Sequence, residues 1–218
     1  MNRNKCRRLP LLLAAIVLAL SATGNASAAD SPRQNGNSIL IAYFGRVGNT
    51  NLPPGLDTVT SASVIAHDGR YYGNTELVAR WIQAHVGGDL FLIQTSELYS
   101  PDYRATVERG ERENREKTRP PLGSHVEGME KYDIIFLGYP AWAYDIPMPL
   151  YSFLEEYDLS GKTVIPFCTS GGSSVSQTAR TIGQLQPRAK LREGITVSHG
   201  RILNSRDSVI DWLKKLGF

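Results

Sequence analysis

The stretch ILIAYFGRVGNT, residues 39–50, decides the fold class of this chain. Its first half, Ile39–Phe44, is an unbroken apolar run, which is typical of a short strand covered on both faces. Its second half is rich in glycine and polar residues, which predicts a loop at the carboxyl end of that strand. Such a strand and loop are typical of α/β proteins, so the rest of the chain should alternate between helix and strand.

The residues that follow show this alternation. Residues 75–86 carry apolar side chains at helical spacing and are followed by Gly87–Gly88, which favours a helix end. Residues 102–117 form a strongly charged helical segment that Pro120 and Pro121 would stop. The other expected elements are strands at 89–93, 132–138, 163–167 and 194–198, and helices at 147–157, 174–186 and 205–216.

Five strands interleaved with helices predict a three-layer α/β sandwich, with a five-stranded parallel sheet between two layers of helices. In such sheets ligands bind outside the carboxyl ends of the strands. The loops expected at this edge are the three that follow Phe44, Gly138 and Phe167.

The N-terminus has the layout of a secretory signal peptide. Four basic residues precede the apolar run Leu11–Leu20, and small residues follow up to Ala29. The run is shorter than the roughly 20 residues that span a membrane. We expect a signal peptide at 1–28, a flexible lead at 29–38 and a single domain at 39–218. The mature chain should then be periplasmic or secreted, without stable membrane insertion.

Removal of this segment changes the charge balance. The whole chain has 24 Lys and Arg against 21 Asp and Glu, and the signal holds four of the basic residues and no acidic ones. The mature part is therefore 20 against 21, so its composition does not point to a nucleic-acid partner. Cys168 is the one cysteine left, which excludes an intramolecular disulfide.

The tripeptide Gly-Asn-Thr occurs twice, at 48–50 and 73–75. A phosphate needs convergent donors and the positive end of a helix, and only the second copy precedes a clear helix. We therefore expect a phosphate site at Gly73, Asn74 and Thr75, with Gly45 and Arg46 contributing. Residues 51–72 would be an inserted loop over this site. Alternatively, both copies are simple turns or helix caps.

The second loop offers aromatic side chains for a planar ligand. Trp and Tyr faces can stack on such a ring. The expected contributors are Pro140, Ala141, Trp142, Ala143 and Tyr144. The alternative is that these aromatics form a lid on the core or a contact patch for a partner.

The third loop carries two glycines whose backbone N–H groups could bind ligand carbonyl oxygens. Its expected contributors are Thr169, Ser170, Gly171, Gly172 and Ser173. The loop does not match the G-x-S-x-G pattern of a nucleophile elbow. We interpret Cys168 as a buried residue at a strand end.

These segments together resemble the flavodoxin superfamily, in the branch of short flavodoxin-like proteins whose first loop reads AYFSRxGNT. The matching stretches are 42–46, 73–75, 89–91, 136–140, Trp142, 147–149 and 167–173. The resemblance implies a strand order of 2-1-3-4-5, bound FMN, and electron transfer or reduction of quinone-type acceptors. Two departures stand out, because Gly45 replaces the family's usual serine and Trp142-Ala143-Tyr144 replaces its usual paired tryptophans.

Several functions remain open under this resemblance. The protein could be an electron carrier for a redox partner, or an oxidoreductase that uses NAD(P)H to reduce a small-molecule acceptor. No GxGxxG fingerprint is present, so a nicotinamide would bind only transiently. An exported, flavin-free binding protein is the alternative.

Arg7-Arg8 suggests the twin-arginine route, which exports folded proteins. The four histidines show no metal-ligand spacing and are interpreted as surface or packing residues, with no catalytic residue expected.

Overall fold

The computed structural model describes residues 38–53, 63–67 and 70–218. They all belong to one compact unit, residues 31–218. The expected signal peptide at 1–28 lies outside the described residues, as does most of the expected lead at 29–38.

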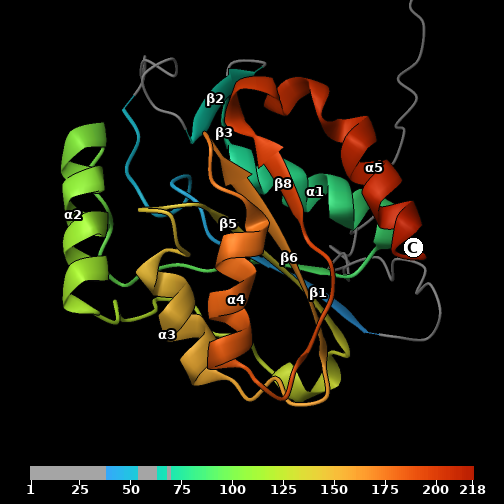
Figure 1. Cartoon of the computed structure of the whole chain (residues 1–218). Coiled ribbons are helices and arrows are strands. Elements are labelled where there is room, and N and C mark those ends of the chain that lie inside the picture. Colours follow the sequence, from blue (N-terminus) through green and yellow to red (C-terminus); the bar gives the residue numbers. More distant parts are fainter. Residues whose placement is uncertain (1–37, 54–62, 68–69) are drawn as a thin grey trace, which may run out of the picture. The chain divides into compact units, whose positions relative to one another are not determined.

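A parallel sheet forms the middle layer of this unit (Figure 1). Its strands are β1 (Ile39–Tyr43), β4 (Asp89–Leu92), β5 (Ile134–Pro140), β6 (Thr163–Ser170), β7 (Lys190–Leu191) and β8 (Ile195–Ser198). Their order is β4-β1-β5-β6-β7, and β8 also pairs with β6. The predicted parallel sheet and its order 2-1-3-4-5 are therefore confirmed.

Two short strands share the position of the predicted fifth strand. β7 pairs with the start of β6, and β8 pairs with its end, from Phe167 to Ser170. The break between them lies beside Pro166, which has no N–H to donate to a ladder. Gly194 packs so closely here that a Cβ would lie 2.4 Å from the carbonyl oxygen of Pro166.

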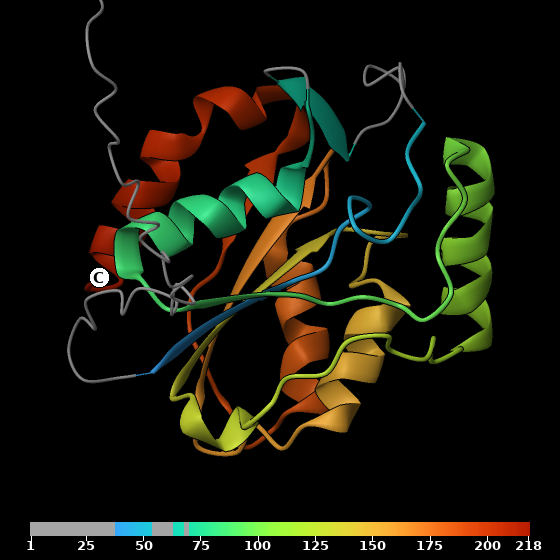
Figure 2. The same ribbon diagram turned by 180° about the vertical axis from the view of Figure 1, so that it is seen from behind.

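Helices cover both faces of the sheet (Figures 1 and 2). α1 (Asn74–Val86) and α5 (Arg206–Lys215) pack on one face, and α3 (Met148–Glu156) and α4 (Val175–Leu185) pack on the other. Two 3₁₀ helices, η2 (Met129–Lys131) and η3 (His199–Asn204), lie in the connections. None of the helices in the described part of the chain has the length and apolar character needed to cross a membrane.

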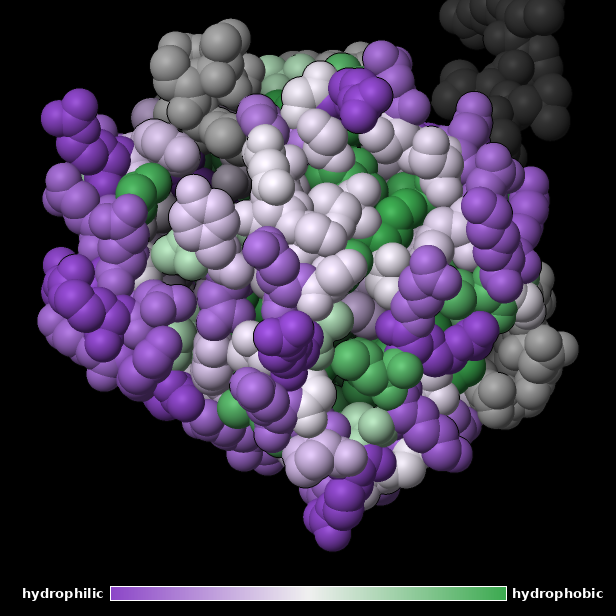
Figure 3. Space-filling model, in the orientation of Figure 1, coloured by the Kyte–Doolittle hydropathy of each residue, from purple (hydrophilic) through white to green (hydrophobic). Residues whose placement is uncertain are grey.

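α2 (Tyr103–Glu116) is the predicted charged helix, and it stands beside α3 rather than against the sheet (Figure 1). The side chain of Asp102 caps it by accepting from the N–H of Ala105 at 2.7 Å. Its outward surface is strongly hydrophilic (Figure 3). The helix still has a buried side, which includes Thr106, Gly110 and Glu113.

The inserted segment 51–72 contains a hairpin that periodicity did not predict. β2 (Val64–His67) pairs antiparallel with β3 (Arg70–Gly73), and β3 leads directly into α1. The hairpin therefore ends where α1 begins, and its first strand brings Ser63 beside that helix start, where the Ser63 carbonyl oxygen accepts from the N–H of Asn74 at 3.0 Å.

The central strand β5 depends on a glycine at a cross-strand position. Gly138 pairs with Phe167 of β6, and a Cβ at 138 would lie 2.1 to 2.8 Å from three atoms of the Phe167 ring. Phe167 is fully buried, so its ring has no open space to enter. The aromatic ring thus covers the bare backbone of the glycine and fills the space that a side chain would occupy.

We expect Gly138→Ala to lower the free energy of unfolding by about 1–3 kcal/mol, because the added methyl overpacks the core. Urea denaturation followed by far-UV circular dichroism measures this change. Gly183→Ala is the matched control, since residue 183 lies inside α4 with its nearest neighbouring atom 3.9 Å from an added Cβ. That change should stabilise the protein by up to about 1 kcal/mol. Equal stability of Gly138→Ala and the wild type would contradict the proposed overpacking.

Candidate functional site

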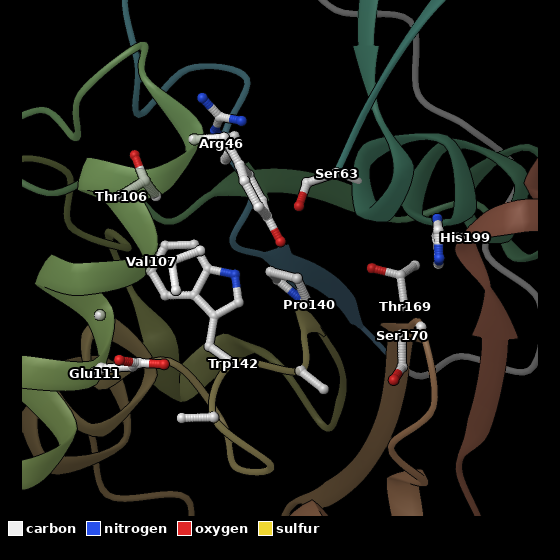
Figure 4. Close-up of a pocket in the computed structure, with 15 residues that line it drawn as sticks. Arg46, Ser63, Thr106, Val107, Glu111, Pro140, Trp142, Thr169, Ser170 and His199 are labelled. Atoms are coloured by element: carbon white, nitrogen blue, oxygen red, sulfur yellow. The ribbon is translucent and has the colours of Figure 1, made fainter. Parts of the chain in front are cut away.

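A cavity of about 360 Å³ opens at the carboxyl ends of β1, β5 and β6 (Figure 4). This is the edge of the sheet where α/β proteins bind ligands, and the volume is within the range of small-molecule sites. Eight of the residues predicted from the three loops line it: Arg46, Pro140, Ala141, Trp142, Ala143, Thr169, Ser170 and Gly171. The other seven predicted residues do not line the cavity: Gly45, Gly73, Asn74, Thr75, Tyr144, Gly172 and Ser173.

The first Gly-Asn-Thr copy has a structural role, because its asparagine is hydrogen-bonded entirely within the protein. The Nδ2 group of Asn49 donates to the carbonyl oxygens of Gly45 and Ile93, both at 3.0 Å. Its Oδ1 accepts from the N–H of Thr95 at 2.8 Å and from the Thr95 hydroxyl at 3.2 Å. All four hydrogen-bonding positions of this fully buried amide are filled, which leaves Asn49 nothing to offer a ligand.

The second copy lies at the start of α1, beside the cavity. The hydroxyl of Thr75 is 2.9 Å from that of Thr169, a cavity-lining residue. Gly45 also lies here, because a Cβ added to this glycine would be 4.0 Å from the Cβ of Thr75. The structure therefore brings Gly45, Thr75 and Thr169 together at the positive end of a helix.

Two of the backbone donors expected at this helix start are engaged within the protein. The N–H of Gly73 donates to Glu76 Oε2 at 3.3 Å, and the N–H of Asn74 donates to the carbonyl oxygen of Ser63. Glu76 is held in turn by Arg80, at 2.8 Å. A ligand at this end would rely on the hydroxyl groups and the helix dipole rather than on these two N–H groups.

Arg46 places a positive charge in the cavity wall. Its side chain is only 2% exposed, and its Nη2 donates to the carbonyl oxygen of Pro101 at 2.9 Å. Burial lowers the pKa of this guanidinium, while the nearby Tyr103 and Asp102 act in the opposite direction. An arginine stays charged under such conditions, so the wall favours a ligand with an anionic group.

Trp142 forms the wall across the cavity from Thr169 and Ser170 (Figure 4). Its ring meets Phe44 and Tyr99 edge-on, with centroid distances of 5.4 and 5.2 Å. It also lies against Gly110 of α2, where a Cβ would come within 3.1 Å of the indole. The indole is thus fixed from three sides and cannot swing freely.

The loop after β5 turns sharply just beyond this tryptophan. Trp142 and Asp145 exchange two backbone hydrogen bonds, and the two residues between them, Ala143 and Tyr144, have φ of 47° and 64°. This is the backbone of a type I′ turn, which non-glycine residues adopt at a cost. The turn leaves Tyr144 81% exposed, with its neighbour Ala143 on the cavity.

Asp145 holds that turn in place. Its Oδ1 accepts from the N–H of Ile146 and from the hydroxyl of Thr181 on α4, both at 2.8 Å. Its Oδ2 accepts from the hydroxyl of Tyr151 on α3 at 2.7 Å. Burial, together with this bond to Asp145, raises the pKa of Tyr151 to about 12.

The loop after β6 is organised around Ser170. Its hydroxyl oxygen accepts from the N–H groups of Gly172, at 3.0 Å, and of Ser173, at 2.6 Å. These two donors therefore bond within the loop, whereas Gly171 lines the cavity. Cys168, just before the loop, is fully buried, and burial raises the pKa of its thiol to about 12. A thiol of this kind is a poor nucleophile.

Seven further residues line the cavity that were not predicted from the sequence: Ser63, Tyr103, Thr106, Val107, Gly110, Glu111 and His199. Five of them lie on α2, which the sequence predicted as a strongly charged helix and not as part of the site. A signal was available in Gly110, because a glycine inside a helix often marks a close approach. His199 directly follows β8, at the same edge of the sheet as the other loops.

Within the described residues, no group of histidine, cysteine or carboxylate side chains could hold a metal ion.

We expect Asp145→Ala to lower the free energy of unfolding by about 2–3 kcal/mol, because it removes the acceptor of three hydrogen bonds. Urea denaturation measures the loss. Asp211→Ala is the control, since that carboxylate is exposed and pairs only with Lys214 at 3.4 Å. Its effect should stay within about 0.5 kcal/mol. If the two variants were equally stable, Asp145 would not be the residue that holds the turn in place.

Comparison with known proteins identifies the family to which this fold belongs. A family model described as flavodoxin matches residues 65–216, which is more than half of the chain. A solved structure described as a flavoprotein, from Bacteroides uniformis, is 28% identical with a TM-score of 0.63, covering 82% of this chain and 99% of that one. A flavoprotein in complex with FMN, from Lactobacillus acidophilus, shares the fold at 16% identity and a TM-score of 0.55, covering 80% and 97% of the two chains. A search of curated proteins found no match. The chain belongs to the flavodoxin family.

Proposed function

We propose that this protein binds FMN in the cavity and uses it for electron transfer or for the reduction of quinone-type acceptors. The observation that carries the proposal is the polarity of the cavity. Hydroxyl groups and the start of α1 gather at the Thr169 side, and Trp142 forms the wall on the other side (Figure 4). A ligand with a phosphate at one end and a flat aromatic ring at the other matches this division.

The described residues fit such a ligand at both ends. Thr75, Thr169 and the dipole of α1 would hold the phosphate, and the buried charge of Arg46 favours an anionic ligand. Trp142 would limit the position of the ring, because Phe44, Tyr99 and Gly110 fix its own place. The flavin would supply the redox chemistry, while the protein binds it, orients it and excludes water.

The family relationship supports the same ligand. The Bacteroides uniformis structure is described as a flavoprotein, and the Lactobacillus acidophilus structure holds FMN. In favour of an enzyme rather than a carrier, the inserted segment contributes Ser63 to the cavity wall, where it would help to shape a substrate pocket.

The visible absorption spectrum of the purified protein tests flavin binding. We expect a yellow protein, or a colourless one that becomes yellow and quenches flavin fluorescence on addition of FMN. A protein that stays colourless and does not take up FMN would be the flavin-free alternative. For a yellow protein, anaerobic oxidation of NADH or NADPH with and without a quinone then separates a reductase from a carrier.

A pair of isosteric substitutions tests which Gly-Asn-Thr copy serves the phosphate. We expect Thr75→Val to raise the Kd for FMN about tenfold, since it removes a hydroxyl beside the proposed phosphate position. Thr50→Val should change the Kd less than about twofold. The Thr50 hydroxyl is buried and has no hydrogen-bond partner among the described residues, so valine can replace it without losing a bond. The opposite ranking, measured by fluorescence titration, would move the phosphate to the first loop.

A further inference from the structure

His199 occupies a distinctive place in the cavity. It is the first residue of η3, directly after β8, and its side chain lines the cavity. Its Nε2 lies 3.3 Å from the position that a Cβ on Gly171 would take. Figure 4 shows it on the side of Thr169 and Ser170, away from Trp142.

This is the end of the cavity where the proposed function puts the phosphate. Gly171, which His199 contacts, belongs to the same loop as Thr169, and Thr169 is hydrogen-bonded to Thr75 at the start of α1. His199 therefore lies against the loop that carries Thr169, on the same side of the cavity as the proposed phosphate position. The helix dipole and the hydroxyl groups there supply only partial charges, whereas an imidazolium would supply a full one.

The imidazole is not committed to another group. Among the described residues, the side chain of His199 makes no hydrogen bond and no ion pair, although it is exposed enough to reach solvent. The charged or titratable residues on the elements around it and across the cavity are Glu76, Arg80 and His85 of α1, Arg201 of η3, Arg206, Asp207, Asp211, Lys214 and Lys215 of α5, and Arg46, Tyr103 and Glu111 of the cavity lining. The one carboxylate of α1, Glu76, is engaged by Arg80 and by the N–H of Gly73.

We propose that His199 is a pH-dependent ligand of the FMN phosphate, so that its protonation strengthens the binding of FMN and not of riboflavin. This inference rests on the proposed function. Histidine is the side chain that changes charge within the physiological pH range, and a phosphate monoester carries most of its second negative charge at neutral pH. The attraction therefore weakens as the pH rises and the imidazole loses its proton.

Fluorescence titration of the purified protein with FMN and with riboflavin, at several pH values from 6.5 to 8.5, tests the proposal. The phosphate stays largely dianionic over this range, so only the protein's charge changes. We expect the Kd for FMN to rise about fivefold from pH 6.5 to 8.5, in line with one partly exposed ionic contact. The Kd for riboflavin should not change over the same range.

Three variants separate His199 from other titrating groups. His199→Gln should bind FMN with a Kd that does not depend on pH and is close to that of the wild type at pH 8.5. His199→Lys keeps a positive charge throughout, so its Kd should stay low at every pH. His125→Gln is the control, because His125 pairs with Glu156 at 2.7 Å and does not line the cavity. It should retain the wild-type dependence.

The outcomes distinguish the two proposals. A wild-type protein that binds neither FMN nor riboflavin overturns the proposed function. A protein that binds FMN with the same pH dependence in the wild type and in His199→Gln overturns the role of His199 alone. An equal pH dependence for riboflavin shows that the phosphate is not the group recognised, and this too overturns the role.

Discussion

The buried side-chain amide of Asn49 is the contact on which the site is built. Its four hydrogen bonds join the loop after β1 to the segment that follows β4, two stretches more than forty residues apart. A backbone bond from the N–H of Tyr99 to the Asn49 carbonyl oxygen extends the link. Tyr99 then supports Trp142, and Arg46 reaches the carbonyl oxygen of Pro101 just before α2. The two sides of the cavity are thus held to one another through a residue that does not line it.

Asn49 also explains why two copies of one tripeptide have different roles. The same three residue types occur at 48–50 and 73–75, but an amide whose donors and acceptors are all engaged is a structural part. The second copy sits at a helix start, where a hydroxyl and a dipole lie beside the cavity. Local sequence is identical in the two places, and the chain around each copy decides what it does.

The sheet and the position of the cavity could be predicted from the sequence because both depend on short-range patterns. Apolar runs such as 134–140 and helical spacing as in 74–86 identify the elements, and parallel strands bring their carboxyl ends to one edge. The contribution of α2 could not be predicted in this way. Its cavity side depends on the contact between Gly110 and Trp142, which are 32 positions apart, and a charged helix gives no local sign of such a partner. The hairpin at 64–73 is also a consequence of pairing rather than of periodicity.

The cavity combines several features that each cost folding free energy unless the surrounding structure supports them. A buried arginine, a turn with two non-glycine residues at positive φ, and a carboxylate that accepts three hydrogen bonds all lie within the loops at one edge of the sheet. Features of this kind collect at binding sites, where the surrounding fold holds them in place. The helices on both faces and the tightly packed strands β5 and β6 supply that support.

Gly110 has a consequence for how such cavities could diversify. The indole of Trp142 rests directly on the backbone of α2 at this position, so the size of residue 110 sets how far the tryptophan stands from the helix. A side chain there would come within 3.1 Å of the indole, so the helix or the ring would have to shift, while every residue of the strand-end loops stayed the same. The width of the cavity is therefore set in part by a peripheral helix, at a position that evolution or design could alter without changing the loops at the strand ends.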